Sequence, residues 1–277
     1  MALSIVDRII GNAPYMCEGD FTDCIRFAKQ LGYTGVELNV ADPASLNLAG
    51  LHAVIQETGM KITAFGTGRA YVNEGLSLTD ALPERRAAAA ARLRTFLDIA
   101  HEFGSLVILG CIRGNLSRAS DETQTLEQLA AAIRELEAYA PGEDTVIVLE
   151  PINRYENNFL CNVADTAAFI HKAGLRRTKI LMDTFHMNIE DPDLVQAIRL
   201  YGGDAAYIHI ADSNRRYPGC GHTDFPAIFA ALAQKGYDGP FCAECCAGGS
   251  PEEDCAAWLH SVQELINSSS KTYGSDQ

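Results

Sequence analysis

The chain has 277 residues, which is close to the roughly 250 residues of a single (β/α)₈ barrel. Its formal net charge of −14 argues against nucleic acid and anionic membranes as partners, because both would repel it. The nine cysteines are scattered, and there is no secretory leader and no apolar run of about 18 residues. We therefore expect reduced thiols in a cytoplasmic protein that does not span a membrane.

Strands and helices are expected to alternate along the whole chain. Short apolar and β-branched runs predict strands at residues 3–6, 35–39, 61–65, 105–109, 146–149, 179–182, 205–208 and 241–243. Helix formers between caps and stop signals predict helices at residues 20–31, 43–58, 83–103, 123–139, 163–173, 192–200, 225–235 and 251–267. These units predict a parallel sheet with helical cover, and a closed (β/α)₈ TIM barrel is the version that fits.

The chain is expected to form one domain, because no linker or shift in composition divides it. We assign residues 1–268 to the barrel. Residues 269–277 are polar, and we expect them to form a frayed C-terminal tail.

Four potential metal ligands follow four successive predicted strands. Glu150 ends the run TVIVLE, and Asp183, His209 and Glu244 follow at intervals of about one strand plus one helix. A charged group at the end of a buried strand is costly unless a metal, a partner charge or solvent compensates it. The carboxyl ends of barrel strands converge on one site, so we expect the four side chains to meet. Three carboxylates and an imidazole favour Mn²⁺, Mg²⁺ or Co²⁺, and zinc is not excluded.

Several motifs resemble the xylose-isomerase-like sugar isomerase/epimerase superfamily, and within it the ketose 3-epimerases of the D-tagatose and D-psicose type. They are EPINRYE (150–156), DTFHMNIED (183–191), HIADSNRRYPGCGHTDF (209–225) and AEC (243–245). GTGRAYVNEGLSLTD (66–80) and LVILGCIRGN (106–115) resemble the 5-keto-L-gluconate epimerase branch. The resemblance extends from about residue 32 to residue 244, and its motifs are most specific in the C-terminal half.

The resemblance implies an epimerase that inverts carbon 3 of a ketose or keto-sugar acid by moving a proton through a metal-stabilised enediolate. It implies one divalent ion, with Mn²⁺ preferred over Mg²⁺ or Co²⁺, on Glu150, Asp183, His209 and Glu244. Glu150 and Glu244 follow strands three apart around the ring, which makes them candidates for two opposed bases. By the same resemblance His186 and Arg215 contact substrate oxygens, and Glu156 is a further carboxylate of the substrate site.

Plainer interpretations exist for the substrate-site residues. Outside the motif, His186 would be a helix-start residue, Arg215 a solvated loop cation and Glu156 a surface charge. Arg69 and Arg113 follow strands at the catalytic face. They would either bind a carboxylate or phosphate of the substrate or be solvated or paired with acidic neighbours.

Three other functions share this pattern. A hydroxypyruvate or inosose isomerase would use a similar proton transfer between carbons 1 and 2. A barrel subunit of a C-glycoside-cleaving complex would need a partner chain. An apurinic endonuclease would need more histidines and basic loops, which the negative charge disfavours. By analogy with the family we expect a homo-oligomer, a dimer or tetramer, that acts on a small sugar.

Overall fold

The computed structural model describes residues 1–9, 13–116 and 121–273. Within these residues, eight parallel strands form a closed ring in which β1 also pairs with β9. The ring consists of β1 (Ala2–Val6), β3 (Gly35–Asn39), β4 (Lys61–Gly66), β5 (Leu106–Leu109), β6 (Ile147–Leu149), β7 (Thr178–Asp183), β8 (Ala205–His209) and β9 (Phe241–Ala243). The short β2 (Cys17–Glu18) adds to the end of β1. The expected TIM barrel is confirmed.

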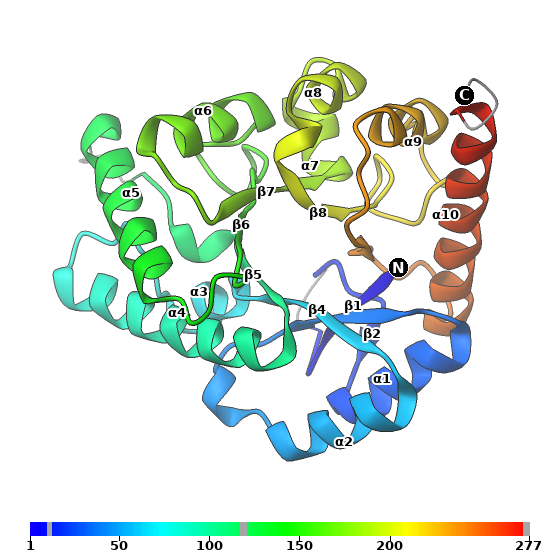
Figure 1. Cartoon of the computed structure of the whole chain (residues 1–277), viewed down its shortest axis with the longest axis horizontal. Helices are drawn as coiled ribbons and strands as arrows, with labels where there is room; N and C mark the ends of the chain where they lie inside the picture. Colours follow the sequence, from blue (N-terminus) through cyan, green and yellow to red (C-terminus); the bar gives the residue numbers. More distant parts are fainter. Residues whose placement is uncertain (10–12, 117–120, 274–277) are drawn as a thin grey trace.

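The helices surround the strands, as Figure 1 shows. In chain order they are α1 (Phe21–Leu31), α2 (Leu48–Thr58), α3 (Gly68–Glu74), α4 (Pro83–Phe103), α5 (Glu122–Tyr139), α6 (Val163–Ala173), α7 (Thr184–Glu190), α8 (Leu194–Tyr201), α9 (Phe225–Gln234) and α10 (Pro251–Tyr273). Short 3₁₀ turns lie at η1 (Pro43–Ser45), η2 (Cys111–Arg113) and η3 (Gly202–Asp204). The helix bounds of α4 and α6 match the sequence expectation.

The interior of the barrel is apolar at one level and polar at the next. Every strand of the closed ring except β3 contributes one residue to a buried interior cluster of Ala2, Ala64, Ile108, Val148, Leu181, Tyr207 and Cys242. From β3, the fully buried Glu37 and the buried Asn39 supply polar groups instead. Asn39 lies so close to Gly66 that a Cβ there would come within 1.9 Å of its Oδ1. Glycine at the end of β4 therefore makes room for the polar layer.

The structure differs from the sequence expectation at α3, α7 and the C-terminus. Neither short helix was predicted, because α3 follows glycines and α7 begins directly at the end of β7. The residue before α7, Asp183, caps this helix by accepting from the backbone N–H groups of Phe185 and His186.

Helix α10 continues to Tyr273 and so includes the first residues of the expected tail, whose fraying stays a prediction. The hydroxyls of Ser268 and Ser269 bond back to carbonyls one turn earlier. The polar serine side chains, which we took as a sign of fraying, therefore form hydrogen bonds within the helix. Residues 274–277 of the predicted tail lie outside the described part of the chain. No helix that the structure describes is long and apolar enough to cross a membrane.

Candidate active site

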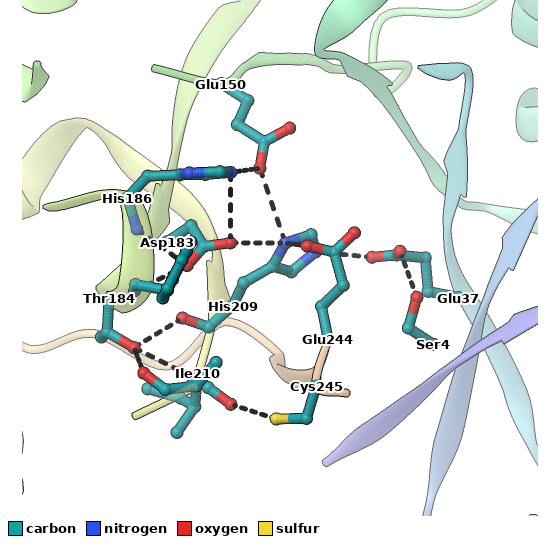
Figure 2. Close-up of polar contacts among 12 residues, drawn as sticks. Ser4, Glu37, Glu150, Asp183, Thr184, His186, His209, Ile210, Glu244 and Cys245 are labelled. Carbon is teal, nitrogen blue, oxygen red and sulfur yellow. Dashed lines mark hydrogen bonds and ion pairs between the residues drawn. The ribbon is translucent and has the colours of Figure 1, made fainter. Parts of the chain in front are cut away.

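The four predicted ligands converge at the carboxyl ends of β6 to β9 (Figure 2). One potential ligand atom from each of Glu150, Asp183, His209 and Glu244 lies within 4.8 Å of all the others. His209 Nδ1 is 3.7 Å from Glu150 Oε1, 3.6 Å from Asp183 Oδ2 and 3.3 Å from Glu244 Oε2. Asp183 and His209 are almost completely buried, and Glu244 is the most exposed of the four. The strand pattern therefore located a real cluster.

This cluster has the chemistry of a cation site. His209 Nδ1 is buried and makes no hydrogen bond to a described residue, although it faces three carboxylates. Burial and repulsion from Glu244 raise the pKa of Glu150 well above its usual value. Burial also opposes ionisation of Asp183, but Arg215, His186 and His209 together outweigh it and hold the pKa of that carboxyl below its usual range. Oxygen ligands with one imidazole suit a hard or borderline divalent ion, so the residues present fit one.

Glu37 orients the imidazole of His209 and was missed by the sequence analysis. Its Oε2 lies 2.8 Å from His209 Nε2, which leaves Nδ1 directed at the carboxylates. Ser4 Oγ and Asn39 Nδ2 donate to Glu37 Oε1 at 2.8 and 2.9 Å, so the buried carboxylate is fixed in place. An ordered carboxylate behind a ligating histidine sets its tautomer and raises its basicity. The sequence feature that could have identified Glu37 is a carboxylate in the middle of the apolar strand GVELN.

The predicted substrate contacts His186 and Arg215 lie beside the cluster. His186, in the first turn of α7, places Nε2 at 3.9 Å from Glu150 Oε1 and 3.8 Å from Asp183 Oδ2. Arg215 Nη1 donates to Asp183 Oδ2 at 2.8 Å, and Nη2 donates to Glu244 Oε2. The Arg215 guanidinium also stacks over the Phe185 ring at 4.6 Å. The structure thus rejects the solvated-loop interpretation of Arg215 and places an imidazole and a guanidinium at the site.

A carboxylate-centred loop holds Arg215 in an unusual backbone conformation. Arg215 has φ of 62°, a left-handed value that is uncommon outside glycine. The carboxylate of Asp212 organises this loop by accepting from the backbone N–H groups of Ser213, Gly219, Gly221 and Thr223. The next strand end adds a further bond, from the N–H of Cys246 to the carbonyl of Arg215 at 2.7 Å. The loop after β8 is therefore fixed on both sides of the guanidinium.

A cavity of about 470 Å³ opens above the cluster. Glu156 is exposed and lines it, so its predicted role at the substrate remains open to test. Arg69 also lines the cavity, where Nη2 pairs with Asp7 at 3.1 Å and Nη1 donates to the carbonyl of Arg8. Arg113 does not line it: the side chain is fully buried and donates to the carbonyls of residues 159 and 160. The substrate-anion interpretation is therefore wrong for Arg113 and open for Arg69.

The helix that carries His186 ends at a buried acid, which predicts a pH-dependent stability. Burial raises the pKa of Asp191 to about 6, and its Oδ2 has no hydrogen-bond partner in the described structure. Because the folded pKa is raised, this group favours the fold most near pH 4 and loses that contribution as pH rises to about 6. We expect Asp191→Asn to raise Tm by a few degrees at pH 7.5 and to leave it unchanged near pH 4.

Thermal unfolding at both pH values checks this expectation. Asp193→Asn is the matched control, since Asp193 is an exposed cap of α8 and asparagine caps helices equally well. An equal gain in Tm at pH 4 and pH 7.5 for Asp191→Asn would show that ionisation is not the cause.

Comparison with known proteins now identifies the family. The family model for xylose isomerase-like TIM barrels matches residues 25–265. The chain belongs to this family. An L-ribulose 3-epimerase of Methylomonas sp. (strain DH-1) is 30% identical over 225 residues, covering 78% of this chain and 75% of that protein. A 3-dehydro-D-guloside 4-epimerase of Escherichia coli (strain K12) is 29% identical over 233 residues, covering 77% and 82%.

A solved structure has the same fold as this family member. The structure of an L-ribulose 3-epimerase superposes with a TM-score of 0.84 at 22% identity, covering 99% of this chain and 97% of that one. The two relatives are both named as epimerases, so the protein is an enzyme. The resemblance recognised in the sequence motifs is confirmed.

Proposed function

We propose that this family member is a divalent-metal-dependent epimerase that inverts carbon 3 of a ketose or keto-sugar acid. The observation that carries the proposal is the convergence of four ligand atoms within 4.8 Å, directly beside His186 and Arg215 and below a cavity of about 470 Å³. The name of the Methylomonas relative, a 3-epimerase, supports carbon 3 as the reacting centre. Mn²⁺ as the native ion, a homo-oligomeric assembly and a cytoplasmic location stay predictions from the sequence.

Four residues would bind the metal ion, and two of these would also transfer the proton. Glu150, Asp183, His209 and Glu244 would hold the ion, which when bound supplies Lewis acidity next to the reacting carbon. Glu150 and Glu244 follow β6 and β9, with β7 and β8 between them, so the two carboxylates approach the cavity from different sides. One takes the proton from carbon 3 and the other returns a proton to the opposite face, with the roles exchanged in the reverse direction.

His186 and Arg215 complete the site as hydrogen-bond donors. Both side chains line the cavity and both lie next to Asp183. Donors that are already fixed in position stabilise the negative charge that develops on a substrate oxygen when the neighbouring carbon loses its proton. Arg69 has a buried Nε without a hydrogen-bond partner in the described structure, which supports testing acidic sugars beside neutral ones.

Hydrogen exchange in D₂O tests the proposal. The metal-loaded enzyme is incubated with a panel of ketoses and keto-sugar acids, and the deuterated carbon is located by NMR. We expect deuterium at carbon 3 of at least one sugar and loss of exchange in excess EDTA, because the chelator removes the ion that would supply the Lewis acidity. Deuterium at carbon 1 without carbon 3 would establish the 1,2-isomerase alternative. Full activity without bound metal would contradict metal dependence.

The same exchange experiment distinguishes the proposed epimerase from a barrel subunit of a C-glycoside-cleaving complex. Exchange by the purified single chain on a free ketose shows that no partner chain is needed. Activity that appears only with a second protein would favour the subunit interpretation.

A further inference from the structure

A buried asparagine connects two residues of the candidate site. Asn153, which is 1% exposed, lies between His186 and Glu156 just after β6. Its Nδ2 is 2.7 Å from His186 Nδ1 and 2.9 Å from Glu156 Oε1. Its Oδ1 accepts from the backbone N–H of Tyr155 at 2.9 Å. The asparagine itself is not among the residues that line the cavity.

These contacts leave only one orientation for the asparagine amide. The carboxylate of Glu156 is acceptor-only when ionised, so the amide group facing it must be the NH₂. The other amide atom faces a backbone N–H and must therefore be the oxygen. The second hydrogen of the NH₂ is then directed at His186 Nδ1. The amide orientation thus follows from its neighbours, which is the sound basis for assigning it.

The orientation of Asn153 determines which nitrogen of His186 carries the proton. The backbone N–H of Asn153 also points at His186 Nδ1, at 3.5 Å, and a backbone N–H is always a donor. Both described contacts of Nδ1 are therefore donors, so Nδ1 is an unprotonated acceptor. In the neutral ring the proton then lies on Nε2, the nitrogen that faces the cavity beside Glu150 and Asp183.

We propose that Asn153 is a positioning residue that fixes His186 in the Nε2–H tautomer, so that the ring presents a hydrogen-bond donor to the substrate. This use of the tautomer depends on the proposed function, whereas the tautomer itself does not. With the proton on Nδ1, the Nε2 lone pair would face two carboxylates and the substrate oxygen. A donor would then be missing where negative charge develops in the transition state.

The tautomer can be read directly by ¹⁵N NMR of histidine-labelled enzyme loaded with diamagnetic Mg²⁺. The chain has seven histidines, and a difference spectrum against His186→Gln assigns the His186 signals. We expect a protonated Nε2 and an unprotonated Nδ1. A protonated Nδ1 in the unaltered enzyme would overturn the proposal without the need for any Asn153 variant.

The Asn153→Asp variant tests whether Asn153 sets the tautomer of His186. An ionised aspartate can only accept, so it should draw the proton to Nδ1 and switch the tautomer. We expect kcat for the carbon 3 epimerisation to fall about 100-fold, with KM changed by no more than about threefold, since a transition-state donor is removed. An unchanged tautomer, or a switched tautomer with unchanged kcat, would refute the positioning role.

Two further variants separate charge from tautomer. Asn158→Asp adds the same charge to an exposed position of the same loop, and it should leave the His186 spectrum and kcat unchanged. Glu156→Gln should preserve the His186 tautomer, because its side-chain carbonyl can still accept from Asn153. If the enzyme epimerises no sugar of the panel, the NMR spectrum still reports the tautomer, so the two proposals fail independently.

Discussion

Glu150→Gln and Glu244→Gln are each expected to slow exchange of the carbon 3 proton by about 1000-fold or more, because each removes a group that takes or returns a proton. The two carboxylates are not equivalent in the structure. In the metal-free site, burial and the charge of Glu244 raise the pKa of Glu150 well above its usual value, whereas Glu244 accepts a hydrogen bond from Arg215. Loss of either carboxylate should therefore stop inversion in both directions.

Both glutamates are also proposed ligands, so loss of the ion must be separated from loss of the base. Exchange is therefore measured at saturating metal and normalised to the metal content of each variant. Glu57→Gln is the control for charge removal, since Glu57 lies on the outer helix α2 and pairs with Arg26. A glutamine variant that binds metal and retains more than about one tenth of the exchange rate would contradict the two-base scheme.

The sequence was informative where function follows local pattern. Each proposed ligand stands directly after a short apolar run, and parallel strands in a closed ring bring their carboxyl ends together. The cluster could therefore be located without coordinates. The roles of these residues as metal ligands and bases stay predictions, because the geometry shows where the side chains lie and not whether they bind a metal ion.

The residues that the sequence analysis missed depend on contacts between distant segments. Glu37 lies in the middle of a strand, where a carboxylate gives no indication of which face it occupies until the strand is paired. Asn153 acts on His186, which is separated from it by a strand and a helix. Arg113 shows the converse error: a cation on a catalytic-face loop looked available, but its side chain folds back onto backbone carbonyls and the Phe159 ring.

Glu37→Gln is expected to weaken Mn²⁺ binding by about 10- to 100-fold, although Glu37 is not one of the four proposed ligands. Its two carboxylate oxygens face donors on both sides: His209 Nε2 on one, Ser4 and Asn39 on the other. A glutamine must turn its NH₂ toward one of these sides. If the NH₂ faces His209, the ring proton moves to Nδ1 and blocks that nitrogen as a ligand. If it faces Asn39, two donors oppose each other in a buried space.

Calorimetric titration of the metal-free protein with Mn²⁺ measures this loss. Ser4→Ala is a graded comparison, because it removes one hydrogen bond to Glu37 but keeps its charge and its contact with His209. Its Kd should lie between those of the unaltered protein and Glu37→Gln. Equal Mn²⁺ affinity in all three proteins would mean that the orientation of His209 is set elsewhere. The buried carboxylate of β3 would then serve the barrel interior rather than the cation site.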